Sequence, residues 1–254
     1  MKNRIVVVGF MQMTTRCRRT GNDNMNARVR RRDFLRAGGI AGLAGLLGGM
    51  SATAAIEAPR RAAKRPAAPS GKVLALLDRI RAAYLTVPEA EGRLLNLLLK
   101  VARARSVLEV GTAYGYTTVW LALALEETGG RLTTIEIKPD RFELARRHVA
   151  EAGLSSRVRG HLGDAHQVLT TLRGPFDLVY LDADKGWQED YFNKLFPKKL
   201  LPGGLFVAHG AILLAEKMKN YLDLVRNHPE LETVLVSAVP EDGFAVSYRR
   251  RAAG

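Results

Sequence analysis

The strongest concentration of reactive side chains in this 254-residue sequence is Asp182-Ala183-Asp184-Lys185, which directly follows the apolar run 176–181. Two carboxylates and an ammonium at the end of a buried strand are costly unless they bind something. Asp182 is suited to hold a hard divalent cation or to anchor a hydrogen bond. Lys185 is suited to remove a proton from a substrate hydroxyl, because a partly desolvated lysine beside a cation readily serves as a base. Asp184 would support these groups or face solvent, and the alternative for the whole cluster is a surface network of ion pairs.

A second pattern, Glu109-x-Gly111-x-x-x-Gly115, joins a short apolar run to a helical one. Gly111 allows a sharp turn and a close approach of the backbone to a ligand, and the helix that follows offers free N–H groups to an anion. The spacing differs from G-x-G-x-x-G, the dinucleotide fingerprint, which argues against a nicotinamide-dependent enzyme. It is typical of enzymes that use S-adenosylmethionine, in which the acid before the first glycine can meet the ammonium group. An ordinary strand-to-helix turn is the alternative.

These groups need a scaffold, and apolar runs alternate with helical patterns from residue 73 onward. The pattern predicts a doubly wound, mostly parallel sheet with an antiparallel C-terminal edge. The expected helices cover 73–85, a segment opened by Pro88, 140–152, 165–172, 188–199 and 213–226. Leu94, Leu95, Leu97, Leu98 and Val101 would be the buried face of the second helix. The expected strands cover 106–110, 131–136, 157–162, 176–181, 204–209, 231–237 and 244–249.

Ligands of such sheets bind at the carboxyl ends of the strands, so the strand ends supply the candidate site residues. Glu136 ends the second strand and could accept both ribose hydroxyls; otherwise it is a solvated charge. The run from Gly163 to His166 ends the third strand, where Asp164 could accept from an adenine amino group or cap the next helix. Trp187 and Tyr191 could wall an aromatic acceptor, but we favour core positions for both.

The formal net charge of +14 resembles that of a nucleic-acid binder until the charges are located. Residues 1–72 hold fifteen Lys and Arg against three Asp and Glu, a charge of +12, which leaves only +2 for residues 73–254. We therefore expect no nucleic-acid partner.

The basic front of the chain has the pattern of an export signal. Residues 31–36, RRDFLR, resemble the twin-arginine motif, and a Gly/Ala-rich run and the A-x-A-like residues 51–55 follow. The run is too short and too rich in glycine for a membrane span. We expect a leader over 1–55, a linker over 56–72 and one domain over 73–254. The protein would be exported to the periplasm, or cytoplasmic if the signal is not used.

Five motifs together resemble the caffeoyl-CoA and catechol O-methyltransferase family: Glu91-Gly92-Arg93-Leu94-Leu95, the glycine loop, 134–140, 177–185 and 201–204. The resemblance implies a seven-stranded class I methyltransferase fold, often dimeric. It also implies transfer of a methyl group from S-adenosylmethionine to a hydroxyl of a small, catechol-like or phenolic acceptor, with Lys185 as base and Asp182 as metal ligand. The implied cofactor site consists of Val87, Glu109, Gly111, Thr112, Tyr114, Gly115, Thr117, Glu136, Ile137, Gly163, Asp164, Ala165, His166 and Asp182.

The sequence departs from that family after the fifth strand, where Asp-Asn is typical and His209-Gly210 stands instead. Glycine offers no ligand, and imidazole suits softer metals than magnesium. Asp182 and His209 could hold such a metal; the metal could be absent, with His209 assisting Lys185; or the protein could be a non-catalytic binder of S-adenosylmethionine or S-adenosylhomocysteine. A histidine that only caps a core strand is the simplest alternative. We favour a catalytic site with a weakened or lost metal, so EDTA should lower activity by less than about tenfold.

Overall fold

The computed structural model describes residues 69–240 and 242–251. The expected leader, residues 1–55, lies outside the described residues, as does most of the expected linker. The end of that linker is helical, because the first helix begins at Gly71, where the side chain of Ser70 accepts a hydrogen bond from the Val73 amide. None of the helices within the described ranges is long and apolar enough to cross a membrane.

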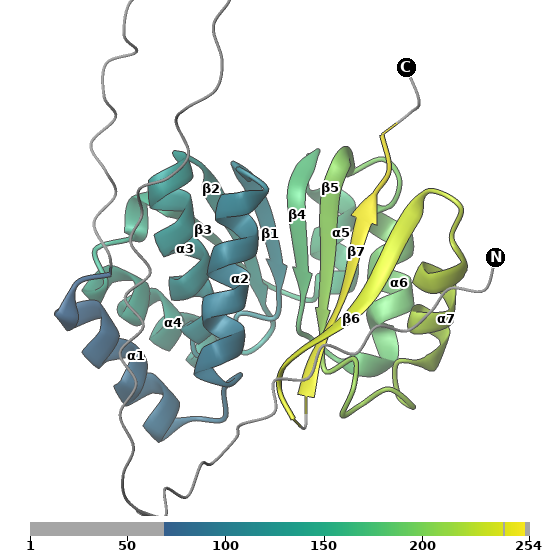
Figure 1. The fold of residues 1–254 in the computed structure, drawn as a ribbon. Helices are drawn as coiled ribbons and strands as arrows, with labels where there is room; N and C mark the ends of the chain where they lie inside the picture. Colours follow the sequence, from purple (N-terminus) through teal and green to yellow (C-terminus); the bar gives the residue numbers. More distant parts are fainter. Residues whose placement is uncertain (1–68, 241, 252–254) are drawn as a thin grey trace, which may run out of the picture. The chain divides into compact units, whose positions relative to one another are not determined.

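Seven strands form a single mixed sheet in the order β3-β2-β1-β4-β5-β7-β6 (Figure 1). The first five are parallel, and β7 runs antiparallel between β5 and β6. The expected doubly wound sheet with an antiparallel C-terminal edge is confirmed. The strands are β1 (Ser106–Val110), β2 (Arg131–Glu136), β3 (Val158–Leu162), β4 (Phe176–Leu181), β5 (Leu200–His209), β6 (Leu231–Val239) and β7 (Asp242–Arg249).

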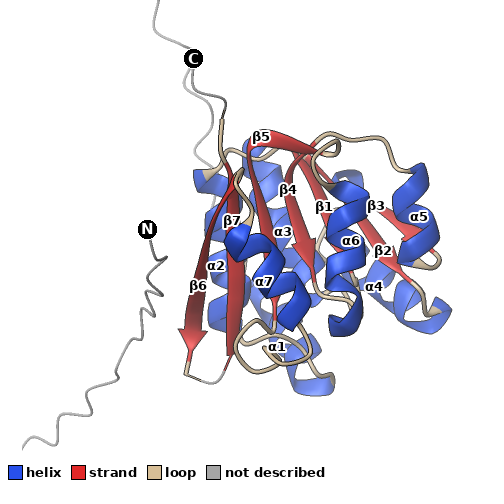
Figure 2. Cartoon of the chain, turned by 90° about the vertical axis from the view of Figure 1, so that its right-hand side faces the viewer, coloured by secondary structure: helices blue, strands red, loops and turns tan. Residues whose placement is uncertain are grey.

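Helices cover both faces of the sheet. Clusters of buried hydrophobic residues join α1 to α4 to one face of the sheet and α5 to α7 to the other. Figure 2 shows α6 and α7 in front of the strands. The helices are α1 (Gly71–Ala83), α2 (Glu89–Val101), α3 (Tyr116–Thr128), α4 (Pro139–Glu151), α5 (Ala165–Thr171), α6 (Gln188–Leu195) and α7 (Lys219–Asn227). The central strands β1 and β4 are buried between the two layers, which explains why their sequences are almost wholly apolar.

Three helices differ from the expectation, and the simplest case is α6, which ends at Leu195 instead of residue 199. The predicted buried face of α2 is partly wrong, because Leu97 and Val101 are 55% and 74% exposed, whereas Glu91, Gly92, Leu95, Asn96 and Leu99 are buried. Gly92 explains this rotation: a Cβ there would lie 2.4 Å from the Trp120 ring, so the bare backbone packs on α3. The expected helix 213–226 is helical only from Lys219, after a series of turns.

The register of the parallel strands aligns the candidate residues. Val110 pairs with both Ile135 and Leu181, and Leu181 pairs with Ala208, so β2, β1, β4 and β5 end level with one another. The residues that follow each pairing position, Glu136, Asp182 and His209, therefore lie along one edge of the sheet.

Candidate active site

A cavity of about 480 Å³ opens at the carboxyl ends of β1 to β4. Eight of the fourteen residues of the implied cofactor site line it: Gly111, Glu136, Ile137, Gly163, Asp164, Ala165, His166 and Asp182. The cavity is also lined by Trp187 and Tyr191, for which core positions are favoured above, and by six residues not predicted for the cofactor site: Val110, Ala113, Ile135, Arg141, Ala183 and Asp184. Most of these omitted residues adjoin a predicted one in the sequence, so the strand-end rule could have found them. Arg141 has only its place in the first turn of α4 as a signal.

The glycine loop approaches β4 closely. Gly111 has φ +101°, and a Cβ there would lie 2.7 Å from the carbonyl oxygen of Asp182. Gly115, the N-cap of α3, has φ +82°, and its Cβ would lie 3.1 Å from the Cα of Ala145. Both glycines are therefore required, by backbone conformation and by space.

Glu136 holds the glycine loop against the end of β2. Its Oε2 accepts a hydrogen bond from the Ala113 amide at 2.7 Å, and its Oε1 accepts one from the Lys138 amide at 2.9 Å. Glu136 is only 6% exposed, so the solvated charge that was the alternative is wrong. Each carboxylate oxygen retains a second lone pair for a ligand in the cavity.

The far end of the cavity is aromatic. Asp164 caps α5 by accepting from the His166 amide at 2.8 Å and also lines the cavity, so the two readings of Asp164 are compatible. His166 Nδ1 lies 2.6 Å from Asp190 Oδ2, and the His166 ring contacts Trp187 and Tyr191 at centroid distances of 4.9 and 5.0 Å. Tyr191 is buried as favoured, but Trp187 is 53% exposed, so its expected core position is wrong.

Glu109 lies beneath the glycine loop and does not line the cavity. It is fully buried, and its carboxylate accepts hydrogen bonds of 2.6 to 2.7 Å from the hydroxyls of Thr117, Thr118 and Thr134. Burial raises the pKa of Glu109 to about 7, although the three threonines act in the opposite direction. The expected contact with a ligand ammonium stays a prediction, since the donors that Glu109 meets here are hydroxyls.

The remaining predicted cofactor residues surround the loop without lining the cavity. Thr112 is 3% exposed and lines a different cavity, together with Thr134. Tyr114 stacks on Tyr84 with a centroid distance of 4.0 Å. Thr117, Gly115 and Val87 lie within the protein core or its turns. Of these residues, Thr112, Tyr114 and Gly115 belong to the glycine loop itself.

Asp182 and Lys185 form the charged pair that the sequence predicts. Lys185 Nζ donates to Asp182 Oδ1 at 2.6 Å, and the Tyr180 hydroxyl donates to Asp182 Oδ2 at 3.0 Å. The Lys185 side chain is 12% exposed and the Asp182 side chain 21%, so the alternative of a surface network of ion pairs is wrong. Burial alone would raise the pKa of Asp182, but Lys185 and His209 outweigh it and lower that pKa.

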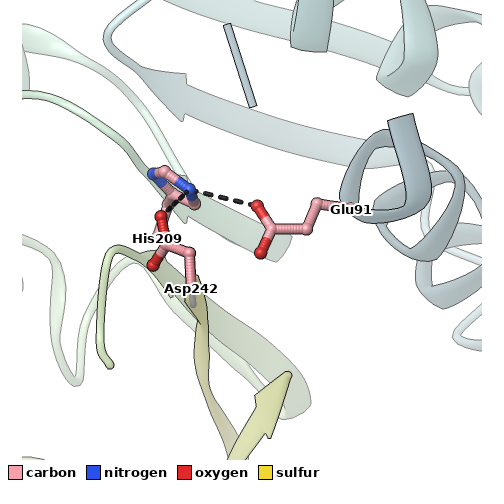
Figure 3. Close-up of side chains that lie close together, drawn as sticks. All are labelled: Glu91, His209 and Asp242. Carbon is pink, nitrogen blue, oxygen red and sulfur yellow. Dashed lines mark ion pairs between the residues drawn. The ribbon is translucent and has the colours of Figure 1, made fainter. Parts of the chain in front are cut away.

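His209 contacts three carboxylates. Its Nδ1 lies 3.0 Å from Asp182 Oδ1, and its Nε2 lies 3.1 Å from Glu91 Oε2 and 3.0 Å from Asp242 Oδ2 (Figure 3). Burial lowers the pKa of His209, but hydrogen bonding to Asp182 and contact with Glu91 raise it to about 9. Asp242 was missed because it faces His209 only through the pairing of β7 with β5.

A hard cation does not fit at Asp182. Lys185 and His209 both contact the oxygen that would bind the cation, and Gly210 offers no side-chain ligand. Glycine here has φ +81° and lies close to the Lys185 side chain. In an Asp-Asn site, a magnesium ion would compensate the charge of the aspartate. In this chain the Lys185 amine and the His209 imidazole contact Asp182 instead.

Comparison with known proteins agrees with this geometry. The profile of a family described as O-methyltransferase matches residues 74–232. A catechol O-methyltransferase of Mycobacterium tuberculosis is 32% identical over 191 residues, which cover 70% of this chain and 86% of that protein. A catechol O-methyltransferase of Niastella koreensis is 37% identical over 132 residues, covering 50% of this chain. That alignment spans only 59% of the Niastella protein, so the chain matches little more than half the length of this relative.

Among solved structures, the chain is similar to the O-methyltransferase TomG from Streptomyces achromogenes, which is involved in tomaymycin synthesis and was solved in complex with SAM. The identity is 28% and the TM-score 0.63, with 72% of this chain and 91% of TomG covered.

Proposed function

Because this chain belongs to the O-methyltransferase family, we propose that it transfers a methyl group from S-adenosylmethionine to a hydroxyl of a small phenolic or catechol-like acceptor. The observation that carries the proposal is the Asp182–Lys185 pair, in which Lys185 contacts an acid that lines a cavity of the right chemistry for the methyl donor. The names of the two catechol O-methyltransferase relatives support the acceptor class.

The cavity offers matching groups for each part of the donor. Glu136 has free lone pairs for ribose hydroxyls, and Asp164 can accept from the adenine amino group while His166 and Trp187 flank the base. Gly111 packs against the Asp182 main chain and also lines the cavity, where its bare backbone is available to the methionine part. When bound, S-adenosylmethionine supplies a methyl group already activated by the positive sulfur.

The chain itself has two tasks, alignment and proton removal. The Asp182 carboxylate is fixed on one oxygen by the Tyr180 hydroxyl and on the other by Lys185, so the Lys185 amine is held at a defined point beside Asp182. In its neutral form, Lys185 accepts the proton of the acceptor hydroxyl at Nζ. A positioned base contributes about 10²- to 10⁴-fold in rate, and alignment of the reacting oxygen contributes further by removing the entropy of encounter.

The test measures binding and turnover separately. Calorimetry should show binding of S-adenosylmethionine and S-adenosylhomocysteine but not of NAD, and a panel of catechols and phenols should yield S-adenosylhomocysteine and a methyl ether. Binding without turnover on any acceptor would favour the non-catalytic binder instead. No affinity for the donor or its product would refute the proposal altogether.

We also propose that the twin-arginine-like leader exports the protein. The support is the sequence of residues 31–36 alone. A fusion of residues 1–72 to a reporter that fluoresces when folded before export should reach the periplasm, and replacement of Arg31 and Arg32 by lysine should abolish this. Equal export of the two fusions would contradict the proposal.

A further inference from the structure

Glu91 is a buried charge that lacks a hydrogen-bonding partner. It lies in the first turns of α2 and is 0% exposed. Within residues 69–240 and 242–251, no hydrogen-bond donor reaches either of its carboxylate oxygens. His209 Nε2 lies 3.1 Å from one of them but likewise makes no hydrogen bond with acceptable geometry. A buried carboxylate is strongly unfavourable unless a cation compensates its charge. The cation beside Glu91 is either a protonated His209 or a bound metal ion.

Three potential ligand atoms converge at this point from three separate elements. Glu91 comes from α2, His209 from the end of β5 and Asp242 from the start of β7, and one ligand atom of each lies within 4.8 Å of the others. Figure 3 shows the two carboxylates directed at the same nitrogen of the imidazole ring, Nε2. The side chains of His209 and Asp242 are each only 14% exposed. One nitrogen and two carboxylate oxygens form an incomplete coordination sphere that water or another ligand can close.

We propose that Glu91, His209 Nε2 and Asp242 bind a divalent transition-metal ion of the zinc type. An imidazole with two carboxylates suits zinc and its first-row neighbours, whereas magnesium prefers oxygen ligands and keeps its waters. This position lies on the Nε2 side of the imidazole, opposite Asp182, and is distinct from a cation bound to Asp182 itself. Metal binding at this position does not depend on the methyltransferase activity.

The surroundings of His209 match those of a metal ligand. A metal-bound histidine usually donates its other ring N–H to a carboxylate, which fixes the tautomer and the ring orientation. His209 Nδ1 lies 3.0 Å from Asp182 Oδ1 and has that partner. The ion would therefore act on the catalytic pair only through His209, as a positioning group for Asp182.

The competing occupant of the site is a proton on His209, because an imidazolium would also neutralise the carboxylates around it. The two occupants differ in what loss of Glu91 does. If the site holds a metal, Glu91→Gln removes a ligand and weakens metal binding, so added metal no longer stabilises the variant. If the site holds only a proton, Glu91→Gln removes an ion-pair partner and destabilises the protein whether or not metal is present.

The experiment uses the full chain, stripped of metal and titrated with Zn²⁺ against a fluorescent chelator. The wild type should bind one Zn²⁺, and Co²⁺ in its place should give the intense visible absorption of a four-coordinate site. Glu91→Gln and Asp242→Asn should each weaken Zn²⁺ binding by more than about 100-fold, and Asp182→Asn, which removes only the outer partner, by about 10- to 100-fold. The melting temperature of the wild type should rise with Zn²⁺, and that of Glu91→Gln should not.

Glu89→Gln is the matched control. It lies two residues earlier in α2, forms an exposed ion pair with Arg93, and should bind Zn²⁺ like the wild type. No bound Zn²⁺ in the folded wild type, equal affinity in Glu91→Gln, or competition by Mg²⁺ at equal concentration would each overturn the proposal. Because all readouts are metal content, absorption and melting temperature, they are unaffected by failure of the proposed methyl transfer.

Discussion

Glu109 and Asp182 are acids on neighbouring strands whose charges are handled in opposite ways. Three threonine hydroxyls surround Glu109, and burial still raises its pKa to about 7. Asp182 meets Lys185 and His209, and its pKa is lowered despite burial. Neutral donors satisfy hydrogen bonds without compensating for lost hydration of a full charge, whereas cations do both. The comparison indicates that Glu109 braces the loop and that Asp182 is kept ionised for chemistry.

The largest effect should come from removal of Lys185, which contacts Asp182. Lys185→Met should lower kcat/KM by about 10³-fold, within the range for loss of a positioned base, with little change in donor affinity by calorimetry. Lys219→Met is the control, because Lys219 donates to Asp223 at the same 2.6 Å but on the surface. Equal losses in the two variants would show that Lys185 has no special role.

The next largest effect is a dependence of the unfolding free energy on pH, which Glu109 should cause. The folded pKa of about 7 exceeds the ordinary value of 4.5, so the folded protein keeps a proton that the unfolded chain releases between these values. The contribution of Glu109 is therefore fully present below pH 4.5 and is lost as pH rises through 7, by about 3 kcal/mol.

Glu109→Gln should not show that loss. Urea unfolding at pH 5 and pH 8 gives the change in unfolding free energy for each protein, and the wild type should lose about 3 kcal/mol more than the variant. The other titrating groups are the same in both proteins, so their contributions to the change in unfolding free energy cancel in the comparison. A variant with the same pH profile as the wild type would show that Glu109 is ionised throughout, like Asp182.

Glu136 adds a third case, a strand-end acid held by two main-chain amides. Glu136→Gln should weaken S-adenosylhomocysteine binding by about 10-fold, because a hydrogen bond to a charged acceptor contributes roughly 1.5 kcal/mol or more. Asp140→Asn, an exposed acid at the start of α4, should leave the affinity unchanged in the same calorimetric titration. Unaltered affinity in Glu136→Gln would restrict Glu136 to holding the loop.

The smallest effect tests the individual hydroxyl donors of Glu109. Thr118→Val keeps the shape of a buried residue but removes one donor, which should cost about 1 kcal/mol of unfolding free energy at pH 8. In the Glu109→Gln background the cost should be smaller, because a neutral amide depends less on that donor. Equal costs in both backgrounds would mean that Thr118 acts through packing alone.

The fold could be predicted from the sequence wherever one physical signal dominated. Apolar runs marked the central strands β1 and β4, and the two glycines of the loop marked a turn that the structure requires at Gly111 and Gly115. The face of α2 was harder, because Leu97 and Val101 fit the helical period as well as Leu95 and Leu99 do. The packing of Gly92 against Trp120 decides which of these faces of α2 is buried. The spacing of apolar residues in α2 does not predict this contact with α3.

For the site, the sequence by itself determined which acids and bases stand at the strand ends, since parallel strands bring their carboxyl ends to one edge. It predicted Glu136, Asp164, Asp182 and Lys185 as site residues, and the first three of them line the cavity. Only the tertiary structure decided that Glu109 points to threonines and that His209 meets Glu91 and Asp242. Those contacts join α2, β5 and β7 across more than a hundred residues, and the charge state of a buried group depends on such distant partners more than on its own sequence neighbours.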